Sequence, residues 1–215
     1  MNPKKYLILM GDVVGSRKKN QLTLINSFKE TIHAVNKEKK NNFLSPMTIT
    51  LGDEFQSIID NLPAALDIIL KIEEKIAAGG KDFKLRYVLE EGEIETPLNS
   101  KIAYGMLGRG LTSAREHLES SKNTTARFTF HLVNKKRNKA LNDAFLVFQG
   151  FIDDWKIDKD HIIIGLFLQH KDYKQVAEET NKDRSLMWRR ERSLKLDQYF
   201  ATKEIIKYIG EEPNV

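Results

Sequence analysis

The sequence predicts an α+β fold for its first 135 residues, followed by a helical C-terminal third. Short apolar, β-branched segments alternate there with stripes of apolar residues at helical spacing. Their order is strand, helix, hairpin, helix, strand, helix and strand, whereas the last third shows mainly helical patterns. A βαββαβ unit with an added helix and strand results, and we predict an antiparallel sheet covered by helices on one face.

The first strand and the first helix are predicted from the segment that begins at residue 5. KYLILMGDVVGS is an apolar run that leads into a loop containing Gly15, which is typical of a strand and its following turn. From Gln21 to about Lys39, apolar residues recur at spacings of three and four, which predicts an amphipathic helix. These residues are Leu22, Ile25, Phe28, Ile32 and Val35.

A hairpin and a second helix come next. In MTITLGDEFQSII, Gly52 and Asp53 interrupt two apolar, β-branched runs, which predicts a hairpin with a tight turn. Asn61 is suited to cap the following helix, with Pro63 in its first turn, and the helix is expected to stop at residues 79–80, a Gly-Gly pair.

The remaining elements complete the first unit. FKLRYVLEEGEI predicts a strand, LTSAREHLE a helix and ARFTFHLV another strand. The basic run that starts at Lys135 predicts a surface turn, so we divide the chain into a domain at 1–135 and a helical domain at 136–215. In this unit the first strand lies beside the hairpin, which would bring Asp12 and Asp53 to one cleft.

The composition excludes several classes of protein. The chain has 215 residues, of which 40% are hydrophobic and 30% charged, which is typical of a soluble globular protein. No run approaches the roughly 20 apolar residues of a membrane span. The absence of cysteine excludes disulfides, thiolate catalysis and zinc-thiolate sites. We expect a cytoplasmic protein, since Gly11 and Asp12 end the first apolar stretch too early for a signal peptide.

Asp12 and Asp53 are the candidate metal ligands. Two carboxylates that converge repel each other, and Mg²⁺ held through oxygen is the usual remedy, with phosphates completing its coordination. Backbone N–H groups of the adjacent loop could cradle these phosphates. Phosphate is therefore the expected ligand group, held by Val13, Val14, Gly15, Ser16 and Arg17. The alternative is that Gly-Asp is only a turn signal.

Four segments in order resemble class III nucleotide cyclases. GDVVGS is similar to the Asp-x-x-Gly turn of that family, and LGDEF resembles its second metal-aspartate hairpin and, more loosely, the palm tip of diguanylate cyclases. LRYVLEEGEI and YGMLGRGLTSAREHLE resemble the segments that follow. The resemblance implies a ferredoxin-like palm that binds a nucleoside triphosphate through the nucleotide-binding residues 13–17. It also implies Asp12 and Asp53 as metal ligands and Arg115 as the catalytic arginine that steadies the triphosphate.

The sequence departs from the cyclase pattern at two positions. Leu111 and Ile49 stand where that family has an asparagine and a lysine, and neither side chain can hydrogen-bond a ribose or a base. Efficient cyclisation is therefore not expected, although nucleotide binding stays open. The alternatives are an exposed pair of Arg115 with Glu119 at helical spacing, and a surface strand position for Arg86.

A second motif lies in the segment YKQVAEETNKDRSLMWRRERSLK, at about 173–195. Ala177 offers the small residue that the helix crossing of a helix-turn-helix requires, and Asn181, four residues later, tolerates a left-handed backbone. Met187 falls where the second helix should pack on the first. The segment resembles the helix-turn-helix of sigma-factor region four.

Positive charge gathers in the same segment. The formal net charge of the chain is +5, and residues 182–195 alone carry six basic side chains against two acidic ones. We predict DNA as a partner, contacted by Lys182, Arg184, Ser185, Arg189, Arg190 and Arg192. The alternative is a solvated basic helix that serves in dimerisation or in closing the domain.

The chain as a whole resembles the SatD family, from GDVVGSR near its start to the basic segment near residue 195. The main hypothesis is a bacterial transcriptional regulator that binds DNA through the C-terminal motif and Mg-nucleotide through the palm. The alternatives are a divergent metal-dependent cyclase or phosphohydrolase, and a catalytically inactive scaffold. A homodimer is expected, because cyclase-like sites often form between two palms.

Overall fold

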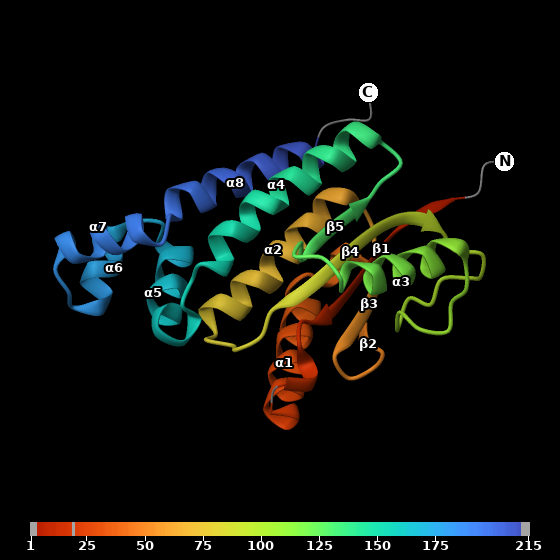
Figure 1. Cartoon of the computed structure of the whole chain (residues 1–215), viewed down its shortest axis with the longest axis horizontal. Helices are drawn as coiled ribbons and strands as arrows, with labels where there is room; N and C mark the ends of the chain where they lie inside the picture. The colour runs from red at the N-terminus through yellow and green to blue at the C-terminus, as the bar shows by residue number, and fades with distance from the viewer. Residues whose placement is uncertain (1–3, 19, 212–215) are drawn as a thin grey trace.

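The computed structural model describes residues 4–18 and 20–211, which form one mixed sheet and a set of helices around it (Figure 1). The strands are β1 (Lys5–Val13), β2 (Phe43–Ile49), β3 (Glu54–Ile59), β4 (Leu85–Glu93) and β5 (Phe128–His131). The α-helices are α1 (Gln21–Glu38), α2 (Leu62–Ala78), α3 (Arg109–Ser121), α4 (Lys135–Asp153), α5 (Ile157–His170), α6 (Tyr173–Thr180), α7 (Arg184–Ser193) and α8 (Leu196–Glu211). The predicted order of elements is confirmed.

The helix boundaries follow local signals in the sequence. The side chain of Asn61 accepts a hydrogen bond from the N–H of Ala64, which caps α2 as predicted, and the helix ends before Gly79. Asn134 caps α4 in the same way through the N–H of Arg137. None of the described helices is long and apolar enough to cross a membrane.

The sheet has the strand order β2-β3-β1-β4-β5, with β1 antiparallel to both β3 and β4. The predicted central position of β1 beside the hairpin is therefore confirmed. The prediction of a purely antiparallel sheet was wrong, because β5 pairs with β4 in parallel. The reason is that α3 lies between these two strands in the chain and forms a crossover connection, which returns the chain in the same direction.

Helices cover both faces of the sheet, and not one face as predicted. Leu9 and Leu89 face α1 and α2, whereas Ile8, Met10 and Val88 face α3, as the alternation of side chains along a strand requires. Residues 8–13 of β1 are all buried, so this strand needs cover on each side. Helix α3 and the loop before it provide the second cover.

Helix α3 starts in backbone contact with β4. A Cβ atom on Gly110 would lie 2.6 Å from the carbonyl carbon of Gly92 and 2.7 Å from the backbone nitrogen of Glu93. Only glycine permits this approach without a shift of the backbone. The contact brings the side chains of α3 directly over the polar row of the sheet described below.

The C-terminal helices share their core with the sheet. One cluster of buried apolar residues extends from Leu9 in β1 to Ile206 in α8. Helix α8 packs against both α4 and α2, while α5, α6 and α7 lie together at one end of the molecule (Figure 1). The division of the chain at residue 135 stays a prediction, and the two parts on either side of it pack as one body of apolar contacts.

Arg127 joins four elements of this shared core. Its guanidinium donates hydrogen bonds to Glu73 of α2 at 3.1 Å, to Asp153 of α4 at 2.9 Å and to the carbonyl oxygen of Leu85 in β4 at 2.6 Å. Arg127 is 6% exposed and immediately precedes β5. Removal of its charge would leave the buried carboxylate of Glu73 without its cationic partner, whereas Asp153 would keep its ion pair with Lys84.

We expect Arg127→Ala to lower the free energy of unfolding by about 3–5 kcal/mol, because one half of a buried ion pair is lost and the other half stays buried. Urea unfolding followed by circular dichroism measures this change. Arg109→Ala is the control, since the side chain of Arg109 is 90% exposed. Equal, small losses for the two variants would contradict the assigned role of Arg127.

The same network predicts a dependence of stability on pH. Burial raises the pKa of Asp153, but the ion pairs with Arg127 and Lys84 lower it further, so that the pKa lies below its usual value of 3.8. A depressed carboxyl pKa stabilises the fold above about pH 4, and this stabilisation is lost as the pH falls through the folded-state pKa. We expect Asp153→Asn to be less stable than the wild type at pH 7 and to lose less stability on acidification. Parallel pH profiles would contradict this.

Candidate functional site

Three charged side chains form a row across β3, β1 and β4, near one end of these strands and on the face that α3 covers. Asp12 of β1 lies directly opposite Glu54 of β3 on one side and Arg86 of β4 on the other. Arg86 donates hydrogen bonds from Nη1 to both carboxylate oxygens of Asp12, at 3.0 and 3.1 Å. All three residues are buried, with 5% of Asp12, 6% of Glu54 and 8% of Arg86 exposed. The alternative of a surface position for Arg86 was therefore wrong.

Helix α3 and its C-cap add two more cations to this row. Arg115 donates a hydrogen bond to Glu54 at 2.9 Å, and the ammonium nitrogen of Lys122 lies 3.6 Å from Asp12 and 3.8 Å from Glu54. The seven-residue spacing of Arg115 and Lys122 is two helical turns, which places both over the sheet. The alternative ion pair of Arg115 with Glu119 is not formed: Arg115 pairs with Glu54, and Glu119 pairs with Lys122 at 2.6 Å.

The environment shifts the ionisation of this cluster. Burial raises the pKa of the Asp12 carboxyl, which Arg86 and Lys122 offset only in part while Glu54 raises it further. Burial lowers the pKa of Lys122, but Glu119 and Asp12 raise it more, so that it lies above the usual value. Lys122 is therefore charged at neutral pH. A bound cation would stabilise the ionised form of the buried Asp12 carboxyl. Carboxyl groups with pKa values shifted by burial and neighbouring charges are common at functional sites.

The charged row forms the inner wall of an open cleft of about 780 Å³. The β1–α1 loop, the β2–β3 turn and the C-terminal end of α3 surround it. The predicted residues Val13, Gly15, Ser16, Arg17 and Asp53 line the cleft together with Asp12. The cleft thus joins segments that are distant in sequence.

Two of the predicted phosphate donors are already occupied. The N–H of Val13 donates to the carbonyl oxygen of Asp53 at 2.9 Å, and the N–H of Val14 donates to that of Lys84 at 2.9 Å. Val14 lines a different hollow, beside Trp155. Phosphate binding by Val13 and Val14 stays a prediction. Gly15, with φ of 67°, and the residues after it keep their place at the cleft.

Sequence reasoning missed Glu54 and Lys122. The β1–β3 register places Glu54, and not Asp53, beside Asp12, while Asp53 lies in the turn and is half-buried. The alternation of Glu54, Gln56 and Ile58 on one face of β3 is a signal that could have identified Glu54. Lys122 follows Arg115 by two helical turns, and this spacing was the available signal for it.

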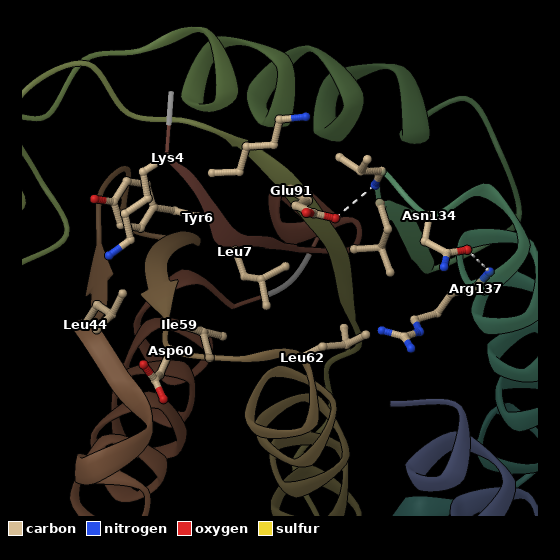
Figure 2. Close-up of a pocket in the computed structure, with 13 residues that line it drawn as sticks. Lys4, Tyr6, Leu7, Leu44, Ile59, Asp60, Leu62, Glu91, Asn134 and Arg137 are labelled. Carbon is tan, nitrogen blue, oxygen red and sulfur yellow. Dashed lines mark hydrogen bonds between the residues drawn. The ribbon is translucent and has the colours of Figure 1, made fainter. Parts of the chain in front are cut away.

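A second cavity of about 500 Å³ lies at the opposite end of the sheet (Figure 2). Its wall combines the apolar side chains of Leu7, Ile59 and Leu62 with acidic and basic groups. Glu91 accepts a hydrogen bond there from the N–H of Val133 at 2.9 Å (Figure 2). None of the predicted site residues lines this cavity, so the cleft at Asp12 is the candidate functional site.

The segment predicted as a helix-turn-helix forms two short helices, α6 and α7, and its assignment as a helix-turn-helix stays a prediction. Ala177 and Met187 are 2% and 1% exposed and lie where α6 and α7 meet, and Asn181 between the helices has a left-handed backbone with φ of 49°. Arg184 pairs with Glu178 at 2.8 Å, and Arg190 pairs with Asp160 of α5. The residues of the predicted DNA-binding set with exposed positions are Lys182, Arg184, Ser185, Arg189 and Arg192. DNA contact stays a prediction.

The fold and the cleft define a mixed α+β protein with a buried, charge-balanced site under one helix. A family model described as the SatD family matches residues 6–209. The chain belongs to the SatD family, as its resemblance indicated. Among curated proteins, none matches the chain.

Several solved structures are similar to part of the chain. One is a bacterial light-regulated adenylyl cyclase, with a TM-score of 0.43 and 13% identity over 60% of this chain and 77% of that chain. Another is the guanylyl cyclase domain of the RhoGC fusion protein from the aquatic fungus Blastocladiella emersonii, with a TM-score of 0.41 and 14% identity over 55% and 74%. Guanylyl cyclase Cya2 has a TM-score of 0.39 and 12% identity over 60% and 75%. Similarities of this size carry no conclusion about function.

Proposed function

We propose that the cleft at Asp12 binds a complex of Mg²⁺ with a nucleoside triphosphate. The observation that carries the proposal is the pairing of two buried carboxylates, Asp12 and Glu54, with the cations Arg86, Arg115 and Lys122. Each acid faces a base in the absence of a ligand. When Mg²⁺ and its phosphates bind, the ion would pair with the carboxylates and the phosphates would pair with the basic side chains. Each ion pair lost between protein side chains would therefore be replaced by an ion pair with the ligand.

The donor set at the cleft fits magnesium. Asp12 and Glu54 offer carboxylate oxygens from adjacent strands, and Asp53 adds a third carboxylate at the lip of the cleft. Hard oxygen donors with room for water and phosphate are what Mg²⁺ requires. When bound, the ion would neutralise phosphate charge. Arg86, Arg115 and Lys122 would then position the phosphates, with the two guanidinium groups as bidentate donors.

Binding is favoured over cyclisation as the activity of this site. Leu111, at the position where the cyclase resemblance expects a ribose-binding asparagine, is 8% exposed and packs in the apolar cluster beneath α3. Ile49 is half-buried at the end of β2. We therefore favour phosphate hydrolysis or regulatory nucleotide binding over cyclisation of the nucleotide. A scaffold that binds no ligand is the remaining alternative.

We also propose that residues 1–135 form a ferredoxin-like palm. What supports this is the order β2-β3-β1-β4, with α1 and α2 on the same face as crossover helices. In such a palm the end of β1 and the β2–β3 turn form the nucleotide site. That two such palms form a homodimer is likewise part of this proposal.

We expect calorimetric titration with ATP and with GTP, each with Mg²⁺, to show binding of one nucleotide per chain. Asp12→Asn and Glu54→Gln should each weaken it by at least about tenfold, which corresponds to 1.4 kcal/mol, because each removes one charged donor to the metal. Asp143→Asn is the matched control, since Asp143 is exposed on α4.

Absence of binding by the folded wild type would overturn this proposal and favour the scaffold alternative. If binding occurs, release of inorganic phosphate separates hydrolysis from regulatory binding. Circular dichroism of each variant establishes that a loss of affinity does not result from unfolding.

A second candidate function is DNA binding by α6 and α7. The observation that favours it is the left-handed turn at Asn181 beside an exposed basic surface on α7. Arg190 contributes less to this surface than expected, because it pairs with Asp160. We therefore assign phosphate contacts to Arg189 and Arg192, and nucleotide occupancy of the cleft would act as the regulatory signal.

We expect the double variant Arg189→Ala, Arg192→Ala to bind duplex DNA more weakly. The slope of the logarithm of the binding constant against the logarithm of the salt concentration should become smaller in magnitude by roughly one for each phosphate contact removed. Fluorescence anisotropy at several salt concentrations measures both quantities. Arg109→Ala with Lys101→Ala removes the same charge from exposed positions away from α7 and is the control. Equal effects of the two double variants would show nonspecific charge attraction and contradict the assignment.

A further inference from the structure

A second polar cluster lies under α3, and it consists of Glu90, His117 and His131. These residues come from β4, α3 and β5, so three elements meet at one point. Glu90 and Arg86 face the same side of β4 four residues apart, which separates them by roughly 13 Å. Val88, which is fully buried, lies between them. The cluster is therefore separate from the cleft at Asp12.

The two imidazole rings and the carboxylate are closely arranged. The rings of His117 and His131 are stacked, with centroids 3.5 Å apart and planes inclined by 4°. Nδ1 of His117 lies 2.8 Å from Oε2 of Glu90. One donor atom from each of the three residues lies within 4.8 Å of the others. Three potential ligands thus converge from separate parts of the chain.

Glu90 is a buried carboxylate without a basic partner of the usual kind. It is 9% exposed, and in the described part of the chain no Lys or Arg side chain forms an ion pair with it. Its partners are His117 and the hydroxyl of Ser113, which donates a hydrogen bond to Oε1 at 3.0 Å. Asp12 and Glu54 of the cleft, in contrast, each contact an arginine. A buried carboxylate usually requires a cation or full hydrogen bonding.

We propose that Glu90, His117 and His131 bind one divalent transition-metal ion, of which Zn²⁺ is the expected example. Two imidazoles and one carboxylate are a donor set that Zn²⁺ takes in sites with an open coordination position. Ser113 would hold the second oxygen of Glu90, as outer partners of metal ligands commonly do. The side chain of His117 is 35% exposed, which leaves the fourth position to water.

The two imidazole rings must turn out of their stacked arrangement to bind one ion, because each ring holds a metal in its own plane and these planes are nearly parallel, with centroids 3.5 Å apart. Tetrahedral coordination with bonds of 2.0–2.1 Å separates the ligand atoms by roughly 3.4 Å, and the three donors here lie within 4.8 Å of one another. His117 and His131 are both partly exposed, so rotation of their side chains can provide this movement. Mg²⁺ is not expected here, because it prefers oxygen ligands alone.

A bound ion would join α3 to the edge of the sheet. His131 is the last residue of β5, the strand that pairs with β4 alone, and His117 lies in the middle of α3. An ion that binds only the folded chain stabilises it in proportion to the logarithm of its concentration above Kd. The melting temperature should therefore rise on addition of Zn²⁺.

The test uses the full chain without a histidine tag, titrated with Zn²⁺ by calorimetry and with Co²⁺ by visible absorption. We expect one equivalent of Zn²⁺ and the absorption of four-coordinate Co²⁺ for the wild type. His117→Gln and His131→Gln should each weaken Zn²⁺ binding by more than about tenfold, which is the effect that even outer partners of metal ligands reach. His33→Gln is the control, because His33 is exposed on α1.

Two results would overturn the proposal. One is a wild-type protein that shows neither stoichiometric Zn²⁺ binding nor four-coordinate Co²⁺ absorption, and this measurement decides the matter even if the variants fail to fold. The other is Zn²⁺ binding that survives in a folded variant with both His117→Gln and His131→Gln. Nucleotide binding by that double variant should equal that of the wild type, so failure of this site and failure of the proposed nucleotide site are distinguishable.

Discussion

The burial of β1 on both faces is the constraint on which the rest of the structure depends. Every residue from 8 to 13 is buried, so apolar helices must cover the strand from each side. Helices α1 and α2 do so on one face, where α8 packs against α2, and α3 does so on the other. Charge is tolerated in such a strand only where it is paired, and Asp12, beside Arg86, satisfies this condition.

Helix α3 connects this constraint with function. Its first turn approaches the backbone of β4 at Gly110, which sets the distance between the start of the helix and the sheet. Arg115 and His117 are two residues apart and so leave the helix on opposite flanks. Arg115 contacts Glu54 beside Asp12, and His117 contacts Glu90 toward the sheet edge. One helix thus positions the proposed nucleotide site and the proposed metal site, with buried Val88 between them.

The C-terminal helices contribute stability to the same body. Arg127 binds carboxylates from α2 and α4, so the sheet edge and the helical part are held by one buried ion network as well as by apolar packing. The α6–α7 pair lies at the end of this assembly and away from the cleft (Figure 1). Any influence of the cleft on α7 would therefore have to pass through the shared core that includes α2 and α5.

The sequence by itself determined the order of elements, the cap at Asn61, the hairpin turn and the left-handed position of Asn181, because periodicity, capping and turn preferences act between near neighbours. Only the tertiary structure decided that Glu54 lies beside Asp12, that β5 is parallel to β4, and that α3 covers the second face. Strand register and the path of a crossover depend on contacts between distant segments, which no local pattern encodes. The meeting of Glu90, His117 and His131 follows from the same long-range pairing.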